Sequence, residues 1–178
     1  MSLFKRIATV FRAHKNAEAP LNEFNDNPYE QADVGDIMYV DLEEWLITGK
    51  VTYQDPGFSP HRFMYYLQSG NEIACLIIEK GATYDCLFGK FVKGGLDNPT
   101  RVPTHLTVGD KQFRLENQRK DMVITSGNTD FRSNDQVKLW RYFGKGNTFF
   151  ILQWQDGKFV ACEAMRVLQA EIKVLKNK

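Results

Sequence analysis

The sequence predicts a mainly β protein, with two similar small barrel-like or curved antiparallel sheet units in tandem and one N-terminal amphipathic α-helix. Three observations support this prediction. Aromatic residues make up 13% of the 178 residues, and flat, bulky side chains pack well on a pleated surface. Short apolar runs alternate with turn signals at the spacing of an all-β domain. Finally, a set of turn-forming and apolar residues occurs twice along the chain.

The predicted strands are runs rich in apolar and aromatic residues, bounded by Gly, Asn, Asp and Pro. They cover residues 37–40, 45–48, 63–68, 72–78, 111–115, 122–125, 137–143, 148–154, 159–163 and 172–175. A tight hairpin is expected at Asp156-Gly157, because both residue types accept positive φ. A helical turn is expected near residues 165–170, before the last strand.

The internal repeat divides the body into residues 34–103 and 104–178. Val34-Gly35-Asp36 recurs as Val108-Gly109-Asp110, and Thr48-Gly49 has a counterpart around Thr125-Ser126-Gly127. Five further residues recur 76 positions later; they are Tyr66, Gly70, Asn71, Leu76 and Gly81, matched by Tyr142, Gly146, Asn147, Leu152 and Gly157. Most of these residue types serve turns or strands. We therefore interpret the shared residues as scaffold.

Residues 1–16 predict a basic amphipathic helix that Ser2 can cap. At about 100° per residue, one face collects Leu3, Phe4, Ile7, Ala8, Val10, Phe11 and His14. The opposite face carries Lys5, Arg6, Thr9 and Arg12, with Lys15 at the margin. The segment holds four basic residues and no acid; because the whole chain is +1, the remaining residues sum to −3. Residues 17–33 are polar and are interpreted as a linker.

A helix of this length, about 20 Å, is too short to cross a bilayer but can lie on one. Each basic residue near an anionic leaflet contributes about 1 kcal/mol. Packing of the apolar face on the protein's own β body is the alternative, and periodicity alone leaves both open. The chain has no apolar run near the ~20 residues of a membrane span, and Lys5, Arg6 and Arg12 interrupt any leader-like stretch. We expect a cytoplasmic protein, peripheral on the inner face of the cytoplasmic membrane.

No catalytic, cofactor-binding or metal-binding residues are predicted. Three histidines (His14, His61, His105) and three cysteines (Cys75, Cys86, Cys162) lack metal-ligand spacing. The cysteines are expected to be reduced core thiols. Lys93-Gly94-Gly95 is interpreted as a turn, since no GK[ST] step follows it. Carboxylates such as Glu43, Glu44, Glu79 and Asp156 are interpreted as solvated charge.

The sequence leaves two other functions open. Aromatic residues beside arginines, in segments 62–66 and 140–143, would suit a small-ligand or nucleic-acid binding barrel. The net −3 of residues 17–178 opposes nucleic-acid binding, so no nucleic-acid partner is expected. Cys86 paired with His61 or His105 would suit a cysteine-dependent hydrolase, although a buried thiol explains Cys86 more simply.

The body resembles a bacterial family known as domain of unknown function 4178. The residues that carry the resemblance are Val34-Gly35-Asp36, segments 45–51 and 63–67, Tyr142-Phe143, and segments 152–159 and 171–175. Segment 63–67 departs from the family pattern, which has a Trp and an acidic residue there. The resemblance implies no established activity, but members often accompany membrane-linked stress proteins.

The first 20 residues are similar to the opening of the phage-shock protein A family, through segments 1–7, 11–13 and 17–20. That resemblance implies attachment to a membrane surface or to a phage-shock-like partner. We therefore expect a non-enzymatic adaptor in a bacterial envelope-stress or membrane-maintenance system. The residues expected to contact the anionic membrane or the partner are Leu3, Phe4, Lys5, Arg6, Ile7, Val10, Phe11, Arg12 and Lys15.

Overall fold

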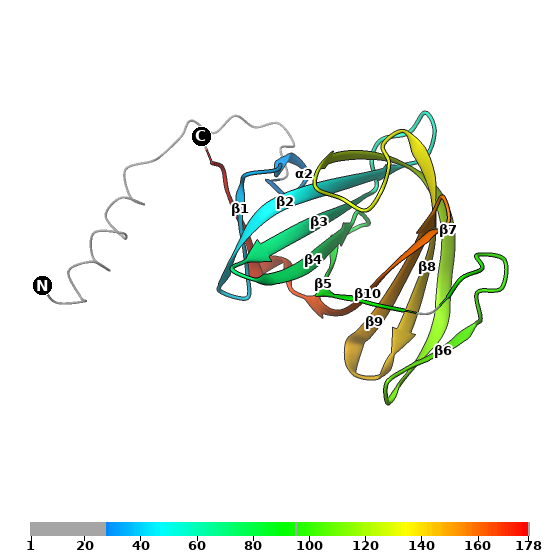
Figure 1. Ribbon diagram of the computed structural model, residues 1–178. Helices are drawn as coiled ribbons and strands as arrows, with labels where there is room; N and C mark the ends of the chain where they lie inside the picture. Colours follow the sequence, from blue (N-terminus) through cyan, green and yellow to red (C-terminus); the bar gives the residue numbers. More distant parts are fainter. Residues whose placement is uncertain (1–27, 95, 178) are drawn as a thin grey trace, which may run out of the picture.

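The described part of the chain forms one antiparallel sheet that closes on itself (Figure 1). The computed structural model describes residues 28–94 and 96–177. Its elements in chain order are α2 (Pro28–Gln31), β1 (Ile37–Val40), β2 (Glu43–Gln54), β3 (Arg62–Ser69), β4 (Glu72–Glu79), β5 (Asp85–Val92), β6 (His105–Val108), β7 (Lys111–Gly127), β8 (Asp135–Gly144), η1 (Lys145–Asn147), β9 (Thr148–Gln155), β10 (Lys158–Val167), η2 (Gln169–Glu171) and β11 (Ile172–Leu175). The sheet order is β11-β1-β2-β3-β4-β5-β10-β9-β8-β7-β6, and β2 also pairs with β7. Strands β2 to β5 and β7 to β10 therefore form a closed eight-stranded barrel.

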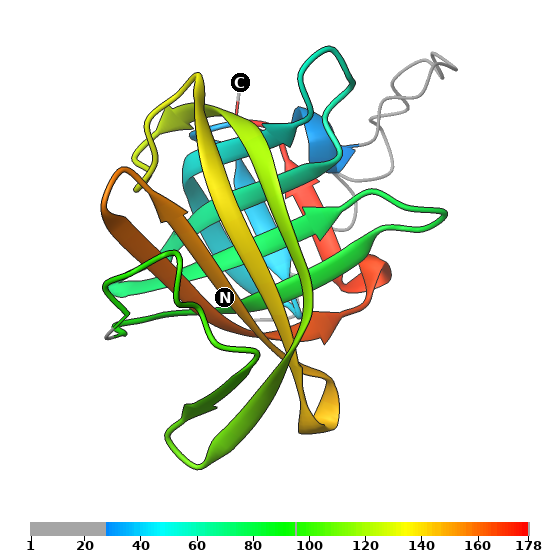
Figure 2. The ribbon, with the colours of Figure 1, turned by 90° about the vertical axis from the view of Figure 1, so that its right-hand side faces the viewer.

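The prediction of a mainly β fold is confirmed, but two tandem units are not. Each half of the chain supplies four successive barrel strands, and the halves join along two seams, β2–β7 and β5–β10. A four-stranded sheet alone would leave two unpaired edges, and closure removes both. The predicted boundary at 103/104 falls in the connection between β5 and β6. Figure 2 shows the hairpin of β6 and β7 projecting from the barrel.

Several predicted boundaries are confirmed and others differ. Strands β1 and β11 have the predicted limits, and the hairpin at Asp156-Gly157 has φ of 50° and 86°. One strand, β7, replaces the two predicted at 111–115 and 122–125, because the polar residues between them stay in the ladder. Strands β5 and β6 were not predicted. Part of the predicted linker forms α2, which begins at a proline, a residue that suits the first helical turn.

Two β-bulges let single strands contribute to two cores. In β2 the register shifts between Ile47 and Gly49, so Trp45 and Ile47 face an outer core while Val51 and Tyr53 face the barrel interior. Strand β7 has a similar shift between residues 115 and 117. Side chains alternate along a strand, so one extra residue moves all that follow to the other face.

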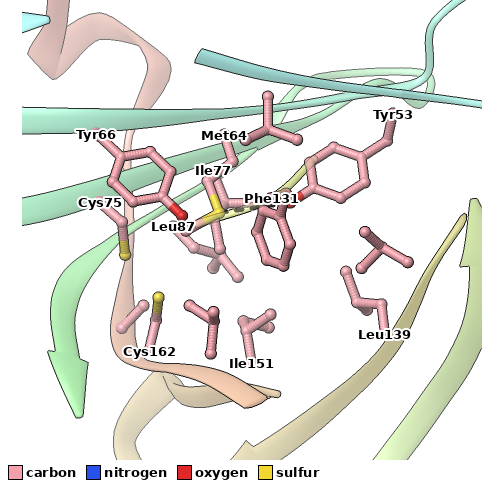
Figure 3. Close-up of a cluster of buried hydrophobic side chains, with 14 of the residues drawn as sticks. Tyr53, Met64, Tyr66, Cys75, Ile77, Leu87, Phe131, Leu139, Ile151 and Cys162 are labelled. Carbon is pink, nitrogen blue, oxygen red and sulfur yellow. Dashed lines mark hydrogen bonds between the residues drawn. The ribbon is translucent and has the colours of Figure 1, made fainter. Parts of the chain in front are cut away.

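The barrel interior is filled with apolar side chains (Figure 3). Met64, Ile77, Leu87 and Ile151 point inward, and Phe131, from the loop after β7, packs among them. The cavity left inside is about 10 Å³, which is room for about one water molecule. Two outer cores cover the barrel wall, one beneath α2, β1 and β11 and the other beneath β6 and the loop before it. The interior formed by the described residues is therefore a packed apolar core.

The residues matched between the halves do not all occupy equivalent places. Leu76 and Leu152 both face outer cores, but Tyr66 faces the interior and Tyr142 an outer core. Gly49 and Gly127 instead meet each other across the β2–β7 seam. A Cβ on Gly49 would lie 2.1 Å from the Asn128 carbonyl oxygen, so this close approach needs glycine.

Candidate functional site

The residues predicted to contact a membrane or partner (Leu3, Phe4, Lys5, Arg6, Ile7, Val10, Phe11, Arg12 and Lys15) all lie outside the described residues. The prediction of an N-terminal helix over residues 1–16 therefore stays a prediction. Within residues 28–94 and 96–177, no helix has the length and apolar character needed to span a membrane.

The three cysteines are free, buried thiols, as predicted. Cys86 lies in an outer core, where burial and the Asp85 charge raise the pKa of its thiol to about 11. A thiol with that pKa is protonated at neutral pH and is a weak nucleophile. Cys75 and Cys162 face each other inside the barrel (Figure 3). In the described part of the chain, no three His, Cys, Asp or Glu side chains come together as metal ligands would.

A chain of buried and half-buried ion pairs occupies the barrel interior where β3 begins and β4 ends. Arg62 lies 3.0 Å from Glu79 and 3.6 Å from Asp121. Arg141 lies 3.2 Å from Glu79 and 2.6 Å from Asp85. We call these five residues the charged end. Arg62 is 3% exposed and Asp121 only 1% exposed, so these charges are desolvated and need their partners.

Two further arginines, Arg166 and Arg119, contact the charged end. Arg166 lies 2.8 Å from Asp85, and Arg119 lies 3.7 Å from Glu79 and 3.6 Å from Asp121. Burial acts to raise the pKa of the Asp85 carboxyl, but hydrogen bonds from Arg166 and Arg141 outweigh it and hold that pKa below its usual value. Asp85 is therefore ionised throughout the neutral range.

His61 contacts the charged end without adding a full charge to it. Its Nε2 lies 3.3 Å from an Asp121 oxygen, a distance at which an ion pair could form. Burial nevertheless lowers the pKa of His61, and Arg119 and Arg62 lower it further, which together outweigh the attraction of Asp121. The imidazole is therefore neutral at pH 7, and its contact with Asp121 is that of a neutral group with a carboxylate.

The acidic and basic side chains at the charged end neutralise one another. An open pocket of about 470 Å³ lies beside it, lined by Glu79, Asp85, Arg141 and Arg166 among others. Each of those four side chains already lies within 4 Å of an opposite charge. Glu79, predicted as a solvated carboxylate, is 22% exposed and is shared by three arginines; that prediction was wrong. These ion pairs fill this end of the barrel and leave little net charge for a ligand.

A second charged feature lies on the outer wall, on β7 and β8. Lys120 and Lys138 are direct cross-strand partners, and the next outward pair is Gln118 with Trp140. The loop before β6 faces these pairs, and together they enclose a pocket of about 320 Å³. We call it the lysine pocket; its lining includes Lys120, Lys138, Trp140, Gln118, Pro99, Thr100 and Val102.

The positive charge of the lysine pocket is not neutralised by the described residues. No carboxylate among them forms an ion pair with Lys120 or Lys138, and the Lys138 ammonium instead lies 5.2 Å from the centre of the Trp154 ring. By contrast, five other lysines each meet a carboxylate: Lys80, Lys90, Lys111, Lys158 and Lys176. The lysine pocket therefore has positive charge to offer a ligand.

Sequence reasoning did not find the lysine pocket. It grouped Trp140 with Arg141, but adjacent strand residues face opposite sides: Trp140 borders the pocket and Arg141 lies at the charged end. The available signal was the alternation of side chains along residues 118–121 and 137–140. This alternation places the lysines on the outer face of the strand and the neighbouring charged or apolar residues on the inner face. Only the β7–β8 register shows that the two lysines are opposite.

Fold and site together define a small closed antiparallel β-barrel protein with a filled interior and a basic pocket on its outer wall. A family model, described as domain of unknown function (DUF4178), matches residues 33–169. The chain belongs to this family, as the resemblance in its body predicted. No curated protein and no solved structure matches the chain. The similarity of the first 20 residues to phage-shock protein A is not supported by these comparisons.

Proposed function

We propose that the protein is a non-enzymatic adaptor at an anionic membrane surface, in a bacterial envelope-stress or membrane-maintenance system. The observation that carries the proposal is the distribution of charge. Residues 1–16 hold four basic residues and no acid, and the rest of the chain sums to −3. A basic segment with one apolar face suits the headgroup region of an anionic leaflet, or a phage-shock-like partner placed there.

The attachment of α2 to the barrel supports the proposal that residues 1–16 contact the membrane or partner separately from the barrel. Lys50 donates from Nζ to the carbonyl oxygens of Glu30 and Ala32, both at 2.7 Å. The Glu30 carboxylate lies 2.7 Å from Lys80, and the Tyr29 hydroxyl donates to the Gln169 carbonyl. The chain is thus held on the barrel from residue 28 onward. Residues 17–27 span up to about 35 Å when extended, enough for residues 1–16 to contact a surface beyond the barrel.

Vesicle flotation tests the proposal. The full chain should float with vesicles that contain phosphatidylglycerol and not with pure phosphatidylcholine vesicles. Replacing Phe4 and Phe11 with Asp should abolish flotation, because two charges on the apolar face oppose insertion. The conservative Thr9→Ser on the polar face is the matched control and should float like the parent. Equal flotation of the Asp variant and the parent, or none from either, would refute the proposal.

A small-ligand binding barrel is the second candidate function, and the lysine pocket is the observation that favours it. The filled interior, with its cavity of about 10 Å³, directs any ligand to the outer wall. The third candidate, a cysteine-dependent hydrolase, is disfavoured by burial of Cys86 and by the raised pKa of about 11 of its thiol.

A further inference from the structure

We propose that the lysine pocket binds a multiply charged anion of the phosphate class, held between Lys120 and Lys138. The ligand is the phosphate group of a small ester or of a lipid headgroup, two sources that share the same chemistry. This inference does not depend on residues 1–16. It follows from the pairing, the shape and the unneutralised charge of described residues.

The direct opposition of two lysines is the first step. Lys120 and Lys138 face each other across β7 and β8, and like charges placed this way destabilise a sheet. Cross-strand partners have Cβ atoms about 5 Å apart, so two flexible lysine chains can converge on one small anion. A bound phosphate would replace the repulsion by two charge-assisted hydrogen bonds.

The walls of the pocket are the second step. Its volume of about 320 Å³ lies in the range of small-ligand sites. Trp140, which is 6% exposed, and Val102 contribute apolar walls beside the two lysines. The facing loop is held in shape at Asn98, whose Oδ1 accepts hydrogen bonds from the Thr100 amide at 2.9 Å and hydroxyl at 2.7 Å.

The distribution of charge around the barrel is the third step. Arg62 and Arg141 of the charged end and Arg166 beside it are already neutralised, each within about 3 Å of a carboxylate. An incoming anion gains little there. Of these two charged features, the lysine pocket is therefore the one that keeps positive charge for an incoming anion.

Titration of the full chain with pyrophosphate, in 150 mM salt, tests the inference through tryptophan fluorescence. Trp140 borders the pocket and Trp154 lies beneath Lys138, so binding should give a saturable change. Lys120→Gln or Lys138→Gln should weaken affinity about 10- to 100-fold, the usual worth of one charge-assisted hydrogen bond, and the double variant should lose the signal. The matched control is Lys145→Gln, in the exposed turn after β8, and it should titrate like the parent.

A second arm separates the two sources of phosphate. Vesicles of phosphatidylcholine with phosphatidic acid are added to the parent and to the Lys120→Gln/Lys138→Gln variant. Weaker vesicle binding by the variant assigns the pocket to a lipid headgroup; unchanged vesicle binding with lost pyrophosphate binding assigns it to a soluble ester. Absence of a saturable pyrophosphate signal in the parent, or the same titration in the double variant, would overturn the inference. Thermal unfolding of each variant confirms that it is folded, and Phe4→Asp/Phe11→Asp should leave the pyrophosphate titration unchanged.

Discussion

The charged end and the lysine pocket share strands β7 and β8, but the charges of the first are paired and those of the second are not. Asp121 of β7 and Arg141 of β8 point into the barrel, where each meets opposite charges. Their sequence neighbours include Lys120, which points outward and faces Lys138. A buried charge must be paired because desolvation is costly, so the charged end reflects a requirement of folding. The opposed lysines meet no such requirement, and a role in binding accounts for them better.

The largest expected effect comes from breaking the charged end at Asp121. Asp121→Ala would leave Arg62 buried with one ion-pair partner, Glu79, which Arg119 also contacts. Removing one member of a buried ion-pair network costs about 3–5 kcal/mol of unfolding free energy. Urea unfolding followed by tryptophan fluorescence measures the loss.

The control for Asp121→Ala is its outward neighbour. Lys120→Ala removes a solvated charge and should change the unfolding free energy by less than about 0.5 kcal/mol. A cost below about 1 kcal/mol for Asp121→Ala would show that the charged end is not the buried, mutually dependent network described above.

The sequence predicted the fold class and most barrel strands because alternation and turn residues are local signals. It did not predict that the halves close into one barrel, since the β2–β7 and β5–β10 seams join residues far apart in the chain. The bulge at Thr48 was also missed. Trp45 and Tyr53 are an even number of residues apart, yet they lie in different cores. Simple alternation would have placed them on one face.

The candidate site was less predictable than the fold. Glu79 looked like a solvated charge at a strand end, and only the barrel's closure surrounds it with arginines from both halves. Lys120 and Lys138 are 18 positions apart, and a shift of one residue in the β7–β8 register would separate them. The signal that sequence did carry, the acid-free segment 1–16, lies outside the described residues.

A pH effect at His61 is the next largest and belongs to the charged end. Burial first, then Arg119 and Arg62, lower the folded-state pKa of His61 despite Asp121, with Asp55 a further opposing charge. The unfolded chain, with a histidine pKa near 6.5, therefore binds more protons just below that pH. Stability should fall as pH drops from about 6.5 toward the folded pKa, by at most about 1.4 kcal/mol per pH unit.

Urea unfolding between pH 7.5 and 5.5 measures the His61 effect. His61→Gln keeps a hydrogen-bond donor and does not titrate, so its unfolding free energy should vary less over this range. Asp85 does not interfere, because its lowered pKa confines its own loss of stability to pH below about 4. If the unfolding free energies of the parent and of His61→Gln changed equally with pH, His61 would not be held neutral by the charged end.

The smallest expected change in stability is that of a charge reversal in the lysine pocket. It tests both the repulsion between the two lysines and their role in binding. Lys120→Glu places a carboxylate opposite Lys138, so repulsion becomes a cross-strand ion pair, a gain of about 0.5–1 kcal/mol in unfolding free energy. Raising the salt should shrink that gain, because the pair is close to solvent. The same variant should lose pyrophosphate binding. Lys145→Glu, in the exposed turn, should gain no stability and keep binding. A destabilised Lys120→Glu would show that the opposed lysines are not a folding cost, and retained pyrophosphate binding would show that they are not a binding site.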